Sequence, residues 1–168
     1  MDCESNNRHQ PVWIIVSVMC FFFLYPVFAR ASIYYVSPGG DDSYPGTLAM
    51  PWQTIQKSAS AAQPGDTVFI RSGIYHERIS FQVSGSESGG YITFQNVPGE
   101  PVIIDGSGTD VSSGEDLVRI EDCHYIRLRG LEIRNNHVNS TELFIKGIMI
   151  TGMSRPIQIF NCDIHHIE

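Results

Sequence analysis

A repeat of ten residues without a gap constrains the fold more than any other feature of the sequence. The segment 126–135 (IRLRGLEIRN) aligns with the segment 157–166 (IQIFNCDIHH), and in both copies the apolar residues fall at relative positions 1, 3, 6 and 8. Alternation with a period of two is typical of β-strands that bury one face. The break in the middle falls at Gly130 and Asn161, residue types that tolerate a left-handed bend. Each copy is therefore predicted to form two short strands joined by a bend.

Similar short runs of β-branched and aromatic residues precede this repeat, separated by clusters of Gly, Pro, Asn, Asp and Ser. The predicted first strands are 68–71 and 92–95, the second strands 79–81 and 102–104, and the third strands 118–120 and 148–150. Strands this short cannot bury a sheet face alone, but stacked coils place their inward residues in continuous apolar columns. The predicted columns are Val68, Ile92, Ile126, Ile157 and Ile70, Phe94, Leu128, Ile159.

This pattern predicts an all-β fold, a parallel β-helix with three-strand coils and about four rungs. An antiparallel sandwich is the alternative interpretation. Tight hairpin dipeptides such as Asn-Gly are absent between the paired strands, which argues against the sandwich.

One helix is predicted before the coils, from Pro51 to Gln63. Proline suits a first helical turn, and the sequence Pro64-Gly65-Asp66 ends the helix. The apolar stripe of this helix is Trp52, Ile55, Ala59 and Ala62. An amphipathic helix at the start of a solenoid is expected to cap the open end of the hydrophobic core.

The N-terminal segment 1–31 is predicted to be a signal peptide. An apolar run covers 12–25, and Ala29 and Ala31 form a cleavage signature, so the mature, exported chain would begin near Ser32. The charge of Arg8 is offset by nearby acidic residues, which leaves an uncleaved N-terminal anchor as the alternative.

The remaining chain is divided into 32–66, an N-terminal strand and capping helix, and 67–168, the coils. It contains Cys123 and Cys162. Export permits a disulfide, but the two cysteines occupy different coil positions, so pairing is not favoured and Cys162 is interpreted as a small core residue.

The net charge of −7 argues against nucleic acid or an anionic membrane surface as a partner. Low charge content, 17% of residues, together with 15 glycines favours a β-rich, turn-rich protein. We expect a monomer. An acidic polymer could bind only where a cation or local Lys and Arg side chains offset the charge.

Several segments together resemble a known family. They are 35–47 (YVSPGGDDSYPGT), 51–56 (PWQTIQ), 63–68 (QPGDTV), 73–75 (GIY), 104–108 (IDGSG) and 130–135 (GLEIRN). This opening resembles that of secreted right-handed parallel β-helix proteins similar to the family 9 pectate lyases, and the resemblance covers nearly all of 33–168. It also resembles alginate lyases, chondroitinase-like enzymes and mannuronan epimerases.

The resemblance implies cleavage of pectate or a related polyuronate by β-elimination. In such enzymes Ca²⁺ held by stacked acidic residues neutralises the uronate carboxylate, and a Lys or Arg removes the proton at C5. In the family these residues lie on coils beyond Glu168. Because the sequence stops within a repeat, we expect an N-terminal fragment whose catalytic residues are unknown and which is inactive alone.

The outward positions of the second strand are predicted to read Ser80, Ile103, Glu132 and Asp163. Adjacent rungs lie about 4.8 Å apart, so Glu132 and Asp163 are candidate ligands for Ca²⁺. The alternative is a solvated ladder of carboxylates screened by neighbouring arginines.

Arg127 and Arg129 also point outward and are candidate substrate-binding residues for an anionic sugar chain. Surface salt bridges with Glu121 or Glu132 are the alternative.

His165 and His166 are expected to point to opposite faces of a strand and hence not to share one metal ion. The pair Asp163 and His165 shares a face and is the better metal candidate, with a polar rim as the alternative.

The first functional hypothesis is an exported polysaccharide lyase acting on pectate or a related polyuronate. The alternatives are a non-catalytic β-helix that binds carbohydrate or serves as a surface scaffold, and a β-helix glycoside hydrolase with two or three carboxylates on one groove. Residues beyond Glu168 would discriminate among the three.

Overall fold

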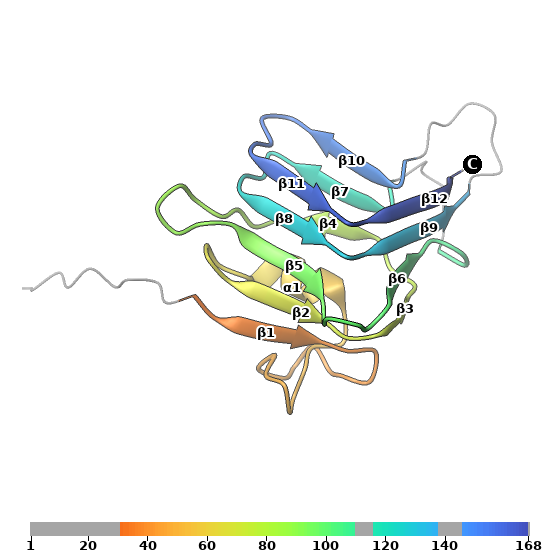
Figure 1. The fold of residues 1–168 in the computed structure, drawn as a ribbon, viewed down its shortest axis with the longest axis horizontal. Helices are drawn as coiled ribbons and strands as arrows, with labels where there is room; N and C mark the ends of the chain where they lie inside the picture. Colours follow the sequence, from red (N-terminus) through yellow and green to blue (C-terminus); the bar gives the residue numbers. More distant parts are fainter. Residues whose placement is uncertain (1–30, 110–115, 138–145, 168) are drawn as a thin grey trace, which may run out of the picture.

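The chain folds into stacked coils of short parallel strands (Figure 1). The computed structural model describes residues 31–109, 116–137 and 146–167. The elements in chain order are β1 (Ile33–Val36), α1 (Ile55–Ala61), β2 (Thr67–Ile70), β3 (Gly73–Tyr75), β4 (Ile79–Phe81), β5 (Ile92–Asn96), β6 (Val102–Asp105), β7 (Val118–Glu121), β8 (Ile126–Arg129), β9 (Glu132–Asn136), β10 (Ile148–Thr151), β11 (Ile157–Phe160) and β12 (Asp163–Ile167). The strands β2-β3-β4, β5-β6-β7 and β8-β9-β10 form complete coils, and β11 and β12 belong to the next coil.

Like strands stack on like strands in three sheets. Their orders are β1-β2-β5-β8-β11, β12-β9-β6-β3 and β10-β7-β4. Every pairing of named strands is parallel. The predicted parallel β-helix is therefore confirmed and the antiparallel sandwich is wrong.

The gap-free repeat is also confirmed. Ile157 pairs with Ile126 and Ile164 pairs with Ile133, so the two copies lie on successive coils in the predicted register. The bends have the expected left-handed backbone, with φ of 67° at Gly130 and 50° at Asn161. The inward residues of the earlier coils form one buried core. Cys123 and Cys162 are both free thiols.

The predicted register between β2 and β5 is wrong by two residues. Val68 pairs with Phe94. Ile92 of β5 has no partner within β2 and pairs only with Ile126 of β8. A shift of two residues keeps every side chain on the same face, so alternation alone cannot separate these registers.

The second strand of the first coil was also assigned wrongly. Ile79–Phe81 is β4 and lies in the third sheet on β7, whereas the second strand is Gly73–Tyr75, which pairs with β6. This short strand contains a glycine and the exposed Ile74, and neither residue produces the alternating signature of a buried strand.

The helix is shorter than predicted. It spans the seven residues Ile55–Ala61 and starts after Thr54, whose side chain accepts a hydrogen bond from the Lys57 N–H. Thr54 is thus the N-cap residue, and Trp52 lies in an extended segment that bridges Val36. Trp52 is buried in the core all the same.

The helix buries Ile55 and Ala59 in the core, as predicted for a cap, and it also covers the free edge of β4. The Gln56 amide takes the place of a neighbouring strand, because its Oε1 accepts from the Ser80 N–H at 2.7 Å and its Nε2 donates to the Ser80 carbonyl at 3.0 Å. Ala59 accepts from the Gln82 N–H at 3.0 Å. The helix therefore satisfies backbone groups that a bare sheet edge would expose.

The predicted signal peptide falls almost wholly outside the described residues, which begin at Ala31. Within 31–109, 116–137 and 146–167, no helix has the length and apolar character needed to cross a membrane.

Candidate functional site

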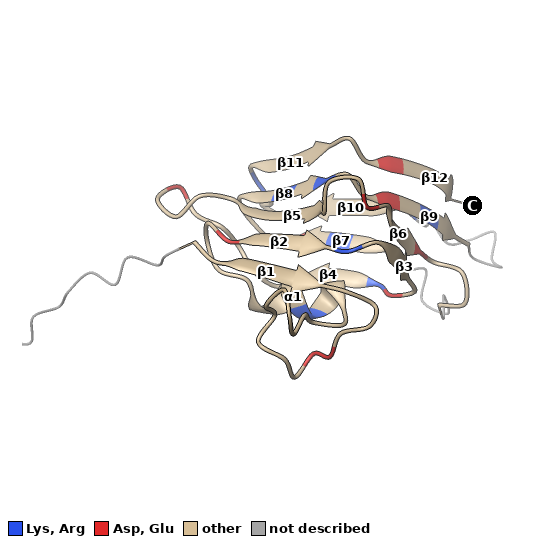
Figure 2. Ribbon diagram, turned by 60° about the horizontal axis from the view of Figure 1, so that its bottom comes forward, with Lys and Arg blue, Asp and Glu red and all other residues tan. Residues whose placement is uncertain are grey.

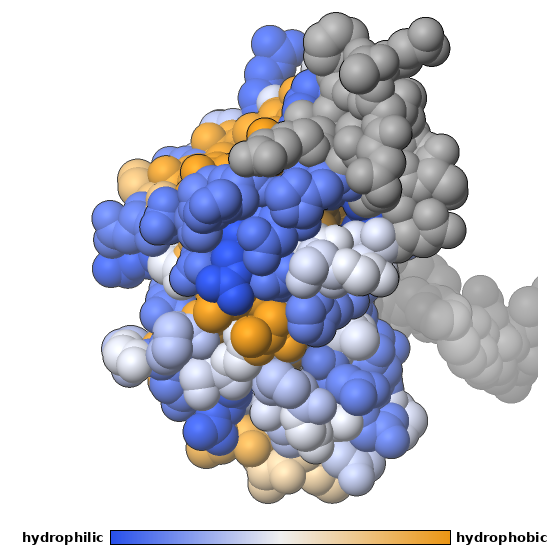
Figure 3. All heavy atoms as spheres, turned by 90° about the vertical axis from the view of Figure 1, so that its right-hand side faces the viewer, coloured by the Kyte–Doolittle hydropathy of each residue, from blue (hydrophilic) through white to orange (hydrophobic). Residues whose placement is uncertain are grey.

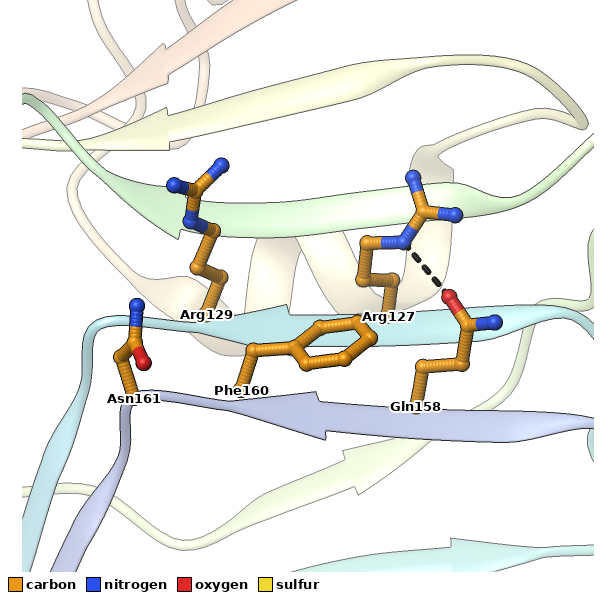
Figure 4. Close-up of a pocket in the computed structure, with 5 residues that line it drawn as sticks. All are labelled: Arg127, Arg129, Gln158, Phe160 and Asn161. Atoms are coloured by element: carbon orange, nitrogen blue, oxygen red, sulfur yellow. Dashed lines mark hydrogen bonds between the residues drawn. The ribbon is translucent and has the colours of Figure 1, made fainter.

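A groove lies on the outer face of the first sheet, over β8 and β11. Its volume is about 540 Å³, and it is lined by Arg127, Arg129, Gln158, Phe160 and Asn161. The two arginine side chains extend in the same direction from β8, and the Phe160 ring extends from β11 toward Arg127 (Figure 4). The structure therefore brings both predicted substrate-binding residues into one groove, while their role stays a prediction.

Arg127 is held in place within this groove. Its Nε donates to Gln158 Oε1 at 2.8 Å, and its guanidinium carbon lies 4.5 Å from the centroid of the Tyr91 ring. Tyr91 in turn packs edge-to-face on Tyr125, with centroids 5.5 Å apart. Contact with an aromatic face stabilises a cation and restricts its motion. The two tyrosines precede their strands and were not anticipated from the sequence.

Arg129 is exposed, and within the described residues neither Arg127 nor Arg129 forms an ion pair. The alternative of surface salt bridges is wrong, because Glu121 and Glu132 pair with other arginines. Both guanidinium groups of the groove can therefore meet an external anion.

The groove combines groups that can bind carboxylates and hydroxyls. Guanidinium groups bind carboxylates through two parallel hydrogen bonds, and the amides of Gln158 and Asn161 can both donate and accept hydrogen bonds with hydroxyl groups. The face continues over Thr93 and Gln95 on β5, which pair with the two arginines in the ladder. A row of polar groups across successive coils suits an extended ligand.

The predicted acidic pair lies beside the groove, on the second sheet. Glu132 and Asp163 are direct partners on adjacent strands, as the repeat predicted, and the acidic positions of β9 and β12 lie side by side in Figure 2. The outward column is Ile74, Ile103, Glu132 and Asp163, so Ile74 takes the position predicted for Ser80. Figure 3 shows this side of the molecule, where hydrophilic residues occupy the centre of the view and apolar areas lie above and below them.

These two carboxylates do not complete a calcium site by themselves. Glu132 Oε1 accepts from Arg134 Nη1 at 2.9 Å and lies 3.2 Å from His165 Nε2, while Asp163 is exposed. Ca²⁺ takes six to eight oxygen ligands. Within the described ranges no group of three or more His, Cys, Asp or Glu side chains could hold a metal ion. The role of Glu132 and Asp163 as Ca²⁺ ligands stays a prediction.

Asp105 is a buried carboxylate whose positioning role has no distinct signal in the sequence. Its carboxylate accepts hydrogen bonds from the Ser107 N–H, Arg134 Nε and Asn135 Nδ2, at 2.9, 2.9 and 3.0 Å. Burial alone would raise the pKa of Asp105, but these hydrogen bonds outweigh it and hold the pKa well below its ordinary value. Arg134 is thereby fixed between Asp105 and Glu132.

The expectation that His165 and His166 point apart is wrong. Alternation requires an extended backbone, and His166 has a left-handed backbone with φ of 51°. The two rings contact each other edge-to-face, with centroids 4.8 Å apart. His165 contacts Glu132 on the neighbouring strand, and the proposed pairing of Asp163 with His165 has no direct contact among the described residues.

Coils of parallel strands, a capping helix and an outer groove of this kind define a parallel β-helix protein with a polar face suited to an extended ligand. Residues 34–168 match the family described as Pel9A-like, right-handed β-helix region. The chain belongs to this Pel9A-like family, and its coils are right-handed.

Two curated relatives share this part of the chain. YwoF of Bacillus subtilis is 39% identical over 137 residues, which are 80% of this chain and 29% of the relative. Pectate lyase PEL9 of Emericella nidulans is 36% identical over 131 residues, which are 71% of this chain and 32% of the relative. The chain thus spans less than a third of the length of either relative.

A solved structure shares the fold. The GH136 lacto-N-biosidase from Eubacterium ramulus superposes with a TM-score of 0.68 at 21% identity, over 82% of this chain and 27% of that protein. At this identity the likeness supports the fold alone.

Proposed function

We propose that the full-length protein containing this chain is an exported polysaccharide lyase that cleaves pectate or a related polyuronate by β-elimination. The observation that carries the proposal is the groove in which Arg127 and Arg129 lie together without ion pairs to described residues. Membership of the Pel9A-like family and the similarity to a pectate lyase support the same substrate class.

The arginines of the groove suit a uronate better than a neutral sugar. A guanidinium group recognises a carboxylate through two hydrogen bonds in a fixed geometry. Because Arg127 is already held by Tyr91 and Gln158, less conformational entropy is lost when the ligand binds. The negative net charge of the chain makes these local cations the main electrostatic attraction for an acidic polymer on this face.

Cleavage requires more than this groove. In β-elimination a base removes the proton at C5, the bond between C4 and the glycosidic oxygen breaks, a C4–C5 double bond forms, and the leaving oxygen takes up a proton. A Ca²⁺ ion would neutralise the uronate carboxylate and acidify the C5 proton. The described residues supply binding groups and one acidic pair, and we assign them no proton-transfer step.

The products of the full-length protein test the proposal. Polygalacturonate should give a rise in ultraviolet absorbance from unsaturated products, and the rise should depend on added Ca²⁺. New reducing ends without the absorbance would indicate a hydrolase, and binding without either product would indicate a non-catalytic carbohydrate-binding protein. No absorbance change with any of several polyuronates would refute the lyase.

Export is tested separately. Sequencing the N-terminus of the protein recovered outside the cell should give a chain that begins near Ser32. Recovery of an intact segment 1–31 would instead indicate an anchor.

A further inference from the structure

Two adjacent histidines at the end of β12 bring their ring nitrogens together. The left-handed backbone of His166 repeats the conformation of Asn135 one coil below, with φ values of 51° and 56°. This bend turns the His166 ring onto that of His165, at an interplanar angle of 74°, and the two Nδ1 atoms lie 2.5 Å apart. Two potential ligand nitrogens thus converge on one point.

The neighbouring strand determines which nitrogen of His165 is free. Glu132 Oε1 lies 3.2 Å from His165 Nε2, and a carboxylate oxygen can only accept a hydrogen bond. We therefore assign the proton of neutral His165 to Nε2, which leaves a lone pair on Nδ1, the atom that faces His166. A histidine that donates one N–H to a carboxylate and presents its other nitrogen outward has the arrangement found around metal-binding histidines.

The charges around this pair favour a cation. Glu132 is positioned by Arg134, which is itself held by Asp105. Together with Asp163, beside Glu132 in the ladder, the cluster holds three carboxylates and one guanidinium group. The excess of negative charge attracts a metal ion to the two ring nitrogens.

We propose that Nδ1 of His165 and Nδ1 of His166 form a two-nitrogen site for a transition-metal ion such as Cu²⁺, Ni²⁺ or Zn²⁺. Imidazole is a preferred ligand of these ions, whereas Ca²⁺ prefers oxygen. Nitrogens bound at about 2.0–2.1 Å to one ion lie about 3 Å apart. The exposed His166 ring must therefore move by about half an ångström from its partner to admit the ion.

This inference goes beyond the lyase proposal and can be tested without substrate. The full-length protein, freed of metal and titrated with Cu²⁺, should show a site whose electron paramagnetic resonance spectrum carries the splitting of two nitrogens. His166→Ala should weaken binding at least tenfold and leave one nitrogen or none in the spectrum. Glu132→Gln should weaken binding about 10- to 100-fold because the orienting carboxylate is lost.

His76→Ala is the matched control, because it removes another exposed histidine in the turn before β4. It should leave the Cu²⁺ affinity and the spectrum unchanged, and circular dichroism should show that all variants are folded. Unchanged Cu²⁺ binding in His166→Ala, or a wild-type spectrum with only one nitrogen, would overturn the proposal and leave a hydrogen bond between the rings as the whole interaction. Since His166 is exposed, its variant is expected to fold even where a His165 variant does not.

Discussion

Phe94 provides a sharp test of how the coils stack. Its side chain is 0% exposed, lies between Val68 and Leu128 in the inward column, and packs edge-to-face on Phe81 with centroids 4.9 Å apart. Phe94→Ala should lower the free energy of unfolding by about 3–5 kcal/mol. Loss of the aromatic pair accounts for about 0.5–1.5 kcal/mol of this. The parallel ladders on both sides prevent the coils from collapsing into the cavity.

Phe69→Ala is the matched control, because Phe69 lies on the outer face of the adjacent strand and stacks on Tyr35 at 5.7 Å. We expect Phe69→Ala to lower the free energy of unfolding by less than about 1.5 kcal/mol, since only part of the apolar surface of Phe69 is buried. Denaturant unfolding of the full-length protein, followed by circular dichroism, compares the two variants. Equal losses, or a larger loss for Phe69→Ala, would refute the inward and outward assignment.

Three further substitutions test the bends and the buried carboxylate of Asp105. Gly130→Ala should destabilise the fold by about 1–2 kcal/mol because its backbone is left-handed; a Cβ there would also meet the Asn96 side chain. Asn161→Gly at the equivalent bend should be neutral or stabilising, so a lower thermal midpoint for this variant would contradict the account. Asp105→Asn should lower the denaturant midpoint near neutral pH. Because the folded-state pKa of Asp105 lies below its ordinary value of 3.8, its ionised form stabilises the fold above that pH. The difference in denaturant midpoint between this variant and wild type should become smaller as the pH falls below 3.8. A difference that stays constant across this range would show that the ionised carboxylate does not stabilise the fold.

The strands of the later coils could be predicted because two copies of one pattern align without a gap, which determines both alternation and register. The earlier coils lack that redundancy. A shift of two residues preserves alternation, so the pairing of Val68 with Phe94 could not be distinguished from a pairing with Ile92. The spacing between strands held a usable signal, because β3 follows β2 as closely as β9 follows β8.

The site was predictable where alternation governs it. Arg127 and Arg129 face outward and Glu132 pairs with Asp163, as the repeat implied. The groups that position these side chains were not predictable, because they lie on turns or depend on backbone angles. Tyr91 lies just before β5 in the chain, and the left-handed conformation of His166 interrupts an otherwise regular strand.

Calorimetric titration with oligogalacturonate shows whether the groove binds an acidic polysaccharide. Arg127→Ala and Arg129→Ala should each weaken binding by the full-length protein, by up to about tenfold to a hundredfold for the half-buried Arg127, whose charge-assisted hydrogen bonds are worth about 1.5–3 kcal/mol. The exposed Arg129 should contribute less.

Arg119→Ala removes an outward arginine of a different sheet and should leave the affinity unchanged. Added salt should weaken the wild-type complex more than that of the double variant Arg127→Ala/Arg129→Ala. Equal affinities for wild type and this double variant, at low and high salt alike, would show that the two arginines do not bind the polysaccharide.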